Sequence, residues 1–226
     1  MKKKILVIGD IHGDEKLVEH IITKFPDHLL VFVGDFLDSF TFSPRAQVRC
    51  IQMVLPLIQE KKAICLMGNH EASYLFPSQR ATGWNEETHR LFLPLQEEVK
   101  QHFVYGYWMP KYSILISHAG LTKDLWDQFG LTKKNLFETL RTWSGNIESP
   151  LYWIGRARGG MRKTSGLLWC DWSHEFKGIP GIKQIVGHTA VKEIETDQEG
   201  NYNIDCLQTA KKGLEIDEGE IRETTL

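Results

Sequence analysis

The sequence predicts an α/β fold in which two packed mixed β-sheets form a β-sandwich with α-helices on its outer faces. Short, fully apolar segments at 5–8, 29–33 and 63–67 alternate with amphipathic helical segments in the first third of the chain. Strands without polar alternation are buried on both faces, and helical connections between them place helices over the sheet. The end of the chain returns to strand patterns, which predicts a second sheet.

Helix signals in the first half support this order of elements. Asp14 is a suitable N-cap for a helix whose apolar residues recur at helical spacing and which ends before Pro26. The next helix begins at Ser43-Pro44, with serine as the cap and proline in the first turn. A third helical segment over 85–101 is interrupted by its internal proline.

The second half is less regular. Segments 103–108 and 112–116 predict a hairpin, and 122–129 and 132–143 predict helices. Residues 144–181 are rich in Gly, Arg and Trp and lack periodicity, which is typical of a functional or mobile loop. The remaining strands are expected at 183–186, 190–195, 201–207 and 213–221.

Composition excludes several classes of protein. With 226 residues, 42% hydrophobic and 25% charged, the chain suits a single globular domain over residues 1–226. A net charge of −2 gives no strong signal for nucleic acid, and no segment has membrane-spanning length. The scattered cysteines, with no CxxC pair, favour a reducing compartment, so we expect a cytoplasmic protein. The cysteines are Cys50, Cys65, Cys170 and Cys206.

Polar side chains follow the predicted strands at the points where these end. Residues two apart in an extended chain point to the same side, so the Asp10-x-His12 pair suits one metal, while Asp35 can bridge two. Oxygen ligands and imidazoles without thiolate are suited to a pair of divalent metals that activates water for displacement at phosphorus. The candidate ligands are Asp10, His12, Asp35, Asn69, His118 and His188.

The motifs D-x-H (10–12), G-D-x-x-D (34–38), G-N-H-E (68–71), H-A-G (118–120) and G-H (187–188) stand in one order along the chain. This order resembles the calcineurin-like metallophosphoesterases. The resemblance is closest to the branch with Ser/Thr phosphoprotein phosphatases and bacterial diadenosine tetraphosphate hydrolases. It implies the double-sheet sandwich and two metal sites. Metal one would be held by Asp10, His12 and Asp35, and metal two by Asp35, Asn69, His118 and His188.

The resemblance also implies roles for two further residues. His70 would donate a proton to the leaving alkoxide, and Asp38 would orient that imidazole and favour its charged form. The nucleophile would be hydroxide shared by the two metals, whose charge lowers the pKa of bound water. Manganese is the first expectation for both cations, with Fe, Zn, Ni, Co and Mg as alternatives. Glu71 is expected to accept hydrogen bonds behind the ligands or to start a helix.

The chain departs from the protein-phosphatase pattern after Asp38. Family members of that type usually continue with Arg-Gly, whereas Ser39-Phe40 stand here. An arginine from elsewhere must then bind the phosphate. Arg158 is the first candidate, because its Arg-Gly-Gly segment is similar to the substrate loop of bacterial members, and Arg45 is an outside one. The full set in the irregular loop is Arg156, Arg158 and Arg162.

Three functions remain open from the sequence. The leading hypothesis is a metal-dependent phosphatase that hydrolyses phosphomonoesters of phosphoproteins or small metabolites. A dinucleoside polyphosphate hydrolase is the enzymatic rival, for which Trp153 and Trp169 would supply stacking surfaces. A non-catalytic scaffold is less favoured, because such proteins usually lose ligands, and all of the expected ligands and His70 are present here.

Overall fold

The computed structural model describes residues 3–79 and 81–226 and contains two five-stranded sheets. The first has the order β10-β9-β1-β2-β3 and the second β4-β5-β6-β8-β7. The first sheet comprises β1 (Ile5–Ile8), β2 (Leu29–Phe32), β3 (Ala63–Cys65), β9 (Lys212–Asp217) and β10 (Glu220–Thr225). The second comprises β4 (Tyr107–Met109), β5 (Ile114–Ile116), β6 (Lys183–Val186), β7 (Glu195–Thr196) and β8 (Tyr202–Asn203). The domain predicted over 1–226 includes Met1, Lys2 and Arg80, which lie outside the described residues.

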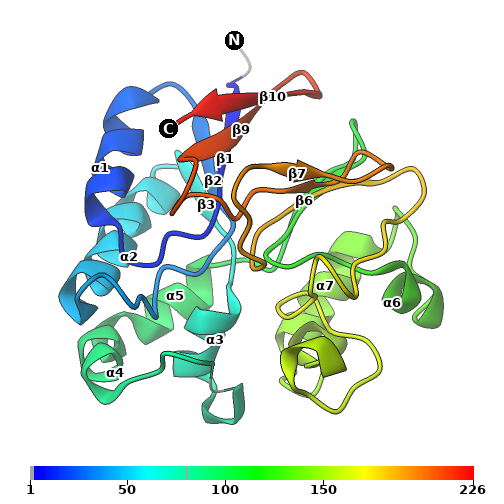
Figure 1. Ribbon diagram of the computed structural model, residues 1–226, viewed down its shortest axis with the longest axis horizontal. Coiled ribbons are helices and arrows are strands. Elements are labelled where there is room, and N and C mark those ends of the chain that lie inside the picture. The colour runs from blue at the N-terminus through cyan, green and yellow to red at the C-terminus, as the bar shows by residue number, and fades with distance from the viewer. Residues whose placement is uncertain (1–2, 80) are drawn as a thin grey trace.

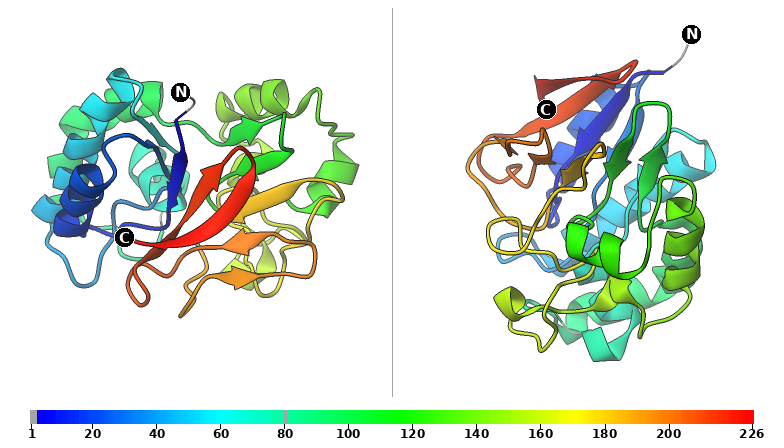
Figure 2. Two further views of the ribbon diagram at one scale, coloured as in Figure 1. Left: turned by 90° about the horizontal axis from the view of Figure 1, so that it is seen from above. Right: turned by 90° about the vertical axis from the view of Figure 1, so that its right-hand side faces the viewer.

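Helices cover the outer faces of the sheets, with α1, α2 and α4 on the side of the first and α6 and α7 on the side of the second (Figures 1 and 2). Asp14 caps α1 and Ser43 caps α2, as the sequence predicts. A short 3₁₀ turn containing Pro94 separates α4 from α5. The helices are α1 (Glu15–Lys24), α2 (Pro44–Gln59), α3 (Asn69–Leu75), α4 (Glu86–Phe92), α5 (Gln96–His102), α6 (Lys123–Gln128) and α7 (Leu136–Ser144).

Strand β1 shows why the apolar segments have no polar alternation. Leu6 and Ile8 belong to the larger core, which includes buried residues of α1 and α2. Ile5 and Val7 belong to a second core shared with strands of the other sheet, including Ile116 of β5. Because successive side chains of a strand point to opposite faces, a strand between these two cores must be apolar throughout.

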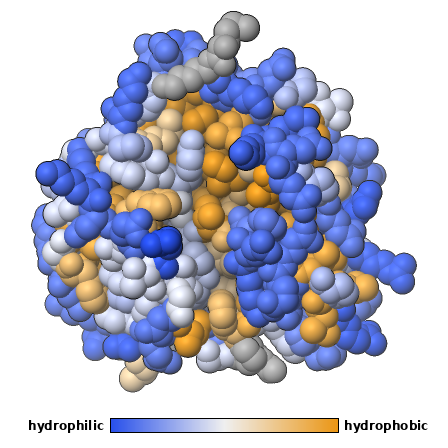
Figure 3. Space-filling model, turned by 180° about the vertical axis from the view of Figure 1, so that it is seen from behind, coloured by the Kyte–Doolittle hydropathy of each residue, from blue (hydrophilic) through white to orange (hydrophobic). Residues whose placement is uncertain are grey.

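The parallel strands define the edge at which polar residues gather. Strands β1, β2 and β3 are parallel, as are β5, β6 and β8, while β9, β10, β4 and β7 pair antiparallel at the margins. The carboxyl ends of parallel neighbours meet at one edge of each sheet. Seen from behind, apolar side chains gather in a seam between hydrophilic flanks (Figure 3). A cavity of about 430 Å³ contacts Ile5, Leu29, Trp108 and Ile216.

The structure confirms the predicted fold class and corrects details of its elements. The expected strand at 190–195 is mostly loop, because Val191 bonds to the backbone of Asp205 outside any ladder and only Glu195–Thr196 pair with β8. The turn that the sequence predicts at Glu218-Gly219 is present, and it divides the expected segment 213–221 into the hairpin β9–β10. Helix α3 begins at Asn69 and has Glu71 in its first turn, in agreement with the helix start that was one of the two roles expected of Glu71.

Candidate metal centre

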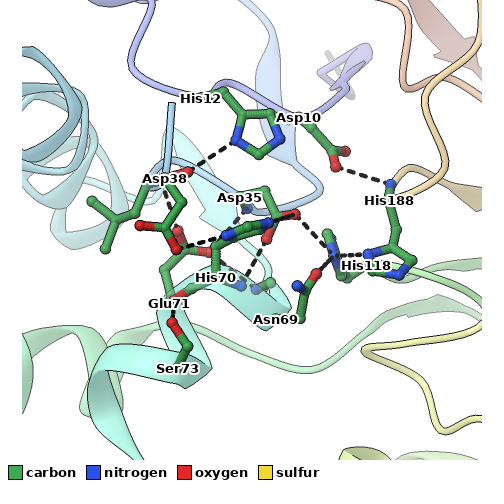
Figure 4. A network of polar contacts seen from close by, with 12 residues as sticks. Asp10, His12, Asp35, Asp38, Asn69, His70, Glu71, Ser73, His118 and His188 are labelled. Carbon is green, nitrogen blue, oxygen red and sulfur yellow. Dashed lines mark hydrogen bonds and ion pairs between the residues drawn. The ribbon is translucent and has the colours of Figure 1, made fainter. Parts of the chain in front are cut away.

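Strand ends from both sheets bring the predicted ligands together. Asp10 follows β1, Asp35 follows β2, His118 follows β5 and His188 follows β6. The backbone N–H of His188 donates to Asp10 Oδ2 at 2.9 Å, and this bond joins the two sheets at the centre (Figure 4). Asp10, Asp35 and His118 are buried, while His188 is half-buried.

One side of the centre holds the four residues expected at metal two. His118 Nε2 lies 2.8 Å from Asn69 Oδ1, 3.2 Å from His188 Nδ1 and 3.4 Å from Asp35 Oδ2. Asn69 is presented by the first turn of α3. His118 Nδ1 donates to the carbonyl oxygen of Val33 at 2.9 Å, which leaves Nε2 as the ligand atom.

The other side contains His12, Asp35 and His70, whose ligand atoms lie within 4.8 Å of one another. His12 Nδ1 donates to the carbonyl oxygen of Leu37 at 2.9 Å, so Nε2 is available to a cation. Asp35 also belongs to the group with His118 and His188, and it is therefore shared by both sides. Asp10, expected at metal one, lies in the same buried cluster but outside this closest trio.

His70 and Asp38 form a close pair beside these groups. His70 Nδ1 lies 2.7 Å from Asp38 Oδ2, and Tyr74 donates its hydroxyl proton to the other Asp38 oxygen. Burial alone would lower the pKa of His70, but the carboxylates of Asp35 and Asp38 raise it to about 9. Without cations beside Asp35 the imidazole is therefore charged at neutral pH, and Asp38 fixes the orientation of its ring.

Glu71 shapes the backbone under the centre from the first turn of α3. Its fully buried carboxylate accepts the N–H groups of Asp35 at 2.9 Å, Phe36 at 2.8 Å, and Leu37 and Gly68 at 3.2 Å. Burial and the nearby carboxylate of Asp35 raise the pKa of Glu71 to about 7. Glu71 thus both starts the helix and positions the loop that carries Asp35.

Backbone conformation at the centre is unusual. His12, Asp35, Asp38 and His188 have φ values of 44°, 50°, 59° and 68°, in the left-handed region that non-glycine residues rarely occupy. Each such residue costs about 1–3 kcal/mol, and this strain persists only where the surrounding contacts impose it. The left-handed turns allow a side chain to project at the end of a strand while the chain reverses toward its helix.

Electrostatics and unpaired atoms test whether cations fit. Burial, with the carboxylates of Asp205 and Asp35, raises the pKa of Asp10 well above its usual range. Burial and the neighbouring cationic groups of His118 and Arg158 hold the pKa of His188 well below its usual range. Asp10 Oδ1 and His188 Nε2 are also buried without a hydrogen-bond partner. Crowded carboxylates and unprotonated imidazoles are the donors that divalent cations need, so these residues fit a metal pair.

Of the three candidate arginines, the structure brings Arg158 to the centre. Its Nη2 donates to Thr189 Oγ1 at 2.7 Å and to the carbonyl oxygen of His188 at 3.5 Å, and its Nε forms an ion pair with Asp171 Oδ2 at 3.1 Å. Arg156 and Arg162 are exposed, and the Arg162 guanidinium lies 4.5 Å from the centre of the Trp153 ring.

Several residues around the centre were not predicted from the sequence. Asp205 follows β8, 8% exposed, and raises the pKa of Asp10. The expected strand 201–207 placed Asp205 inside a strand. Because β8 ends at Asn203, Asp205 is instead a polar residue that follows a strand, like the predicted ligands. Thr189 directly follows the motif residue His188 in sequence and Asp171 adjoins no motif, but the contacts of both with Arg158 depend on the tertiary fold.

Comparison with known proteins identifies this arrangement. The sequence model of the calcineurin-like phosphoesterases matches residues 3–192. This chain belongs to the calcineurin-like phosphoesterase family. Members of this family are metal-dependent hydrolases of phosphoric esters, so the phosphoesterase is an enzyme of that class, as its motifs predict.

Individual relatives of the phosphoesterase are distant. It is 24% identical over 217 residues to the bis(5′-nucleosyl)-tetraphosphatase PrpE (asymmetrical) of Oceanobacillus iheyensis, covering 84% of this chain and 78% of the other. Its fold is similar to a protein serine/threonine phosphatase from Saccharomyces cerevisiae, with TM-score 0.57, 15% identity and coverage of 99% and 80%. A metallophosphoesterase from Sphaerobacter thermophilus has TM-score 0.50, 13% identity and coverage of 99% and 88%. None of the helices within the described ranges is long and apolar enough to span a bilayer.

Proposed function

We propose that this phosphoesterase hydrolyses phosphomonoesters, on phosphoproteins or small phosphorylated metabolites, with two divalent cations. The observation that carries this proposal is the position of Asp35. Its carboxylate lies within 4.8 Å of the ring nitrogens of His12 and His70 on one side and of His118 and His188 on the other. A carboxylate with neighbours on both sides is suited to bridge two cations.

The proposed ligand sets are the ones that the family resemblance implies. Metal one takes Asp10, His12 and Asp35, and metal two takes Asp35, Asn69, His118 and His188. When bound, two cations, with manganese the first choice, supply Lewis acidity and lower the pKa of bound water. The buried, unpartnered oxygen of Asp10 and the His188 Nδ1 that faces His118 Nε2 support the place of these residues in the two sets.

His70 protonates the leaving group. Asp38 holds Nδ1, so the proton that moves is the one on Nε2, and it passes to the ester oxygen as the P–O bond breaks. The Asp38 carboxylate favours the charged form of the ring and so keeps this proton in place. The second carboxylate oxygen of Asp38 is occupied by Tyr74, which fixes the direction of the pair.

Arg158 binds the outer phosphoryl oxygens, in the role that the missing arginine after Asp38 has elsewhere in the family. Its guanidinium is anchored by Asp171 and Thr189 next to the His188 backbone, which supports a fixed position at the edge of the centre. A planar guanidinium can bind two phosphate oxygens at once.

A dinucleoside polyphosphate hydrolase is the second candidate. The name of the relative from Oceanobacillus iheyensis favours it. The centre of the Trp169 ring also lies 5.9 Å from the centre of the His188 ring, which places one of the expected stacking residues at the metal centre, although Trp169 is only 8% exposed. A cytoplasmic site of action is supported by the four free cysteines, all buried.

Substitution of Asp35 tests the proposal. Asp35→Asn should lower the content of both metals together, measured by elemental analysis after loading with Mn²⁺, whereas the exposed Asp27→Asn should keep both. Loss of a single metal would refute the bridge. Turnover of para-nitrophenyl phosphate, nucleotides and dinucleotides with product analysis separates the two enzymes, and no turnover with any of Mn²⁺, Ni²⁺, Co²⁺, Zn²⁺ or Mg²⁺ would favour a scaffold.

A further inference from the structure

A further cavity lies between the end of α5 and helix α7, outside the metal centre. Its volume is about 420 Å³, which is within the range of small-molecule binding sites. Its wall includes Gln101 of α5, Phe103 just after that helix, and Leu140 of α7. Among the described residues, its lining includes none of the proposed metal ligands, and neither His70 nor Arg158. The cavity is therefore separate from the site proposed for hydrolysis.

The walls of this cavity are apolar and mainly aromatic. Phe137 is 56% exposed and Val104 is 40% exposed, although large apolar side chains are usually covered more fully. Both line this cavity. Exposed apolar side chains that meet at one hollow are typical of a ligand-binding surface, whereas scattered ones are not. The aromatic residues of the lining are Phe76, Phe103, Tyr105 and Phe137.

Contacts behind the lining hold the walls in place. The Tyr105 hydroxyl is hydrogen-bonded to the hydroxyl of Tyr152. The Phe76 ring packs edge-on against the Tyr152 ring, with 5.4 Å between the ring centres. The carbonyl oxygen of Val104 accepts the backbone N–H of Met67 at 2.8 Å. The cavity is thus formed before any ligand binds, so binding does not have to order its walls.

The charges at the cavity are all positive. Lys100 and Arg141 line it, and no carboxylate does so within the described part of the chain. Each cation pairs with an exposed glutamate one turn earlier on its own helix, at 2.8 Å between Lys100 and Glu97 and 3.0 Å between Arg141 and Glu138. Exposed pairs of this kind contribute little free energy, so both cations can turn to an anion in the cavity. The lining is therefore complementary to a ligand with negative charge.

We propose that this cavity binds a small, free aromatic ligand that carries an anionic group, of the class of the aromatic carboxylates. The aromatic walls favour a flat ring over an aliphatic chain by about two- to tenfold, because paired rings gain more than burial alone provides. Lys100 and Arg141 bind the anionic group at the mouth of the cavity. The inference does not depend on the proposed function, since no group of the metal centre takes part in it.

Three small molecules separate the contributions of ring and charge. Titration calorimetry with the Mn²⁺-loaded protein compares 2-naphthoate with 2-naphthylmethanol, which lacks the charge, and with decanoate, which lacks the ring. We expect 2-naphthoate to bind most tightly. Phe137→Ala should weaken its binding about threefold or more. The double variant Lys100→Gln/Arg141→Gln should weaken it by a similar factor and leave the binding of 2-naphthylmethanol unchanged.

Control variants place the ligand in this cavity. Phe40 is 86% exposed and Lys134 is exposed, and both lie outside the lining, so Phe40→Ala and Lys134→Gln should bind 2-naphthoate as the native protein does. Val104→Trp adds bulk at the mouth of the cavity and should also weaken binding, so the test does not depend on one variant. The midpoint of urea unfolding should stay the same in Phe137→Ala, because the side chain is largely exposed.

Several results would overturn the inference. Binding of 2-naphthoate that is equal in the native protein, Phe137→Ala and Val104→Trp would place the ligand elsewhere, including at the metal centre. Decanoate that binds as tightly as 2-naphthoate would refute the role of the aromatic walls. A dimer that becomes a monomer in Phe137→Ala, measured by sedimentation, would assign this face to a contact between subunits.

Discussion

Gln47 fixes the loop that joins the Asp38 carboxylate to the surface, and its replacement by leucine tests this role. The side chain is 1% exposed and makes three hydrogen bonds to backbone groups of that loop. Leucine has nearly the same volume and is compatible with a helix, so Gln47→Leu removes the bonds without leaving a large cavity.

The expected loss follows from the groups left without partners. The buried N–H of Asp38 loses its acceptor, which costs about 1–3 kcal/mol. The carbonyl oxygen of Phe42 loses a donor and can turn to water, for roughly 1 kcal/mol more. The bond to the Ser39 oxygen is long, at 3.5 Å, and contributes little. The free energy of unfolding should therefore fall by about 2–4 kcal/mol.

Urea unfolding followed by tryptophan fluorescence measures this loss. Gln52 is exposed on the same helix, so Gln52→Leu is the matched control and should change stability by about 0.5 kcal/mol or less. Chymotrypsin should also cut after Phe40 faster in Gln47→Leu, because the loop opens more readily. If Gln47→Leu equals the control in both measurements, the loop is not held by Gln47.

Three further predictions concern the pair, the anchor of the arginine and the surface. His70→Asn should retain the bound metals and lower turnover about 10²–10⁴-fold for poor leaving groups, whereas equal losses across an aryl phosphate series would exclude a general acid. Asp171→Asn should raise KM about tenfold with little change in kcat, because Arg158 loses its ion pair, and an unchanged KM would refute that anchor. The hydrogen bond from His28 holds the pKa of Glu215 below its ordinary 4.5, so this stabilisation is present above pH 4.5 and is lost as pH falls through the pKa of the folded state. Glu215→Gln should flatten the fall in stability below pH 4.5 in metal-free protein, and profiles of equal slope would contradict it.

Much of the fold was predictable because its strands are apolar on both faces and its helices carry clear caps. Asp14 and Ser43 mark the starts of α1 and α2 through local side-chain chemistry, which a sequence displays directly. The prediction of a strand at 190–195 was wrong, since the apolar residues of this segment are compatible with either a strand or a loop. Whether such a segment joins a ladder depends on which backbone groups lie beside it. Here the backbone N–H of Val191 donates to the carbonyl oxygen of Asp205 instead of to a neighbouring strand.

The candidate site was predictable where residues follow strands and unpredictable where contacts cross the chain. Asp35 and His118 were found by their position after apolar segments. Asp171 could not be found in this way, because its value lies in an ion pair with Arg158. The extent of helix α3 was not predicted, because Asn69 and His70 have modest helix propensity, and only Glu71, whose buried carboxylate organises the first turn, was expected to start a helix.

The hydrogen bond from the His188 backbone to Asp10 lies where the metal centre joins two separately hydrogen-bonded sheets. Cations bound there would connect the two sheets, and their binding free energy would stabilise the sandwich against separation of the sheets. Chelation should accordingly loosen the sandwich as a whole. A shear of one sheet against the other would change the spacing of the ligands, so mechanical cohesion and catalytic competence share the same few atoms.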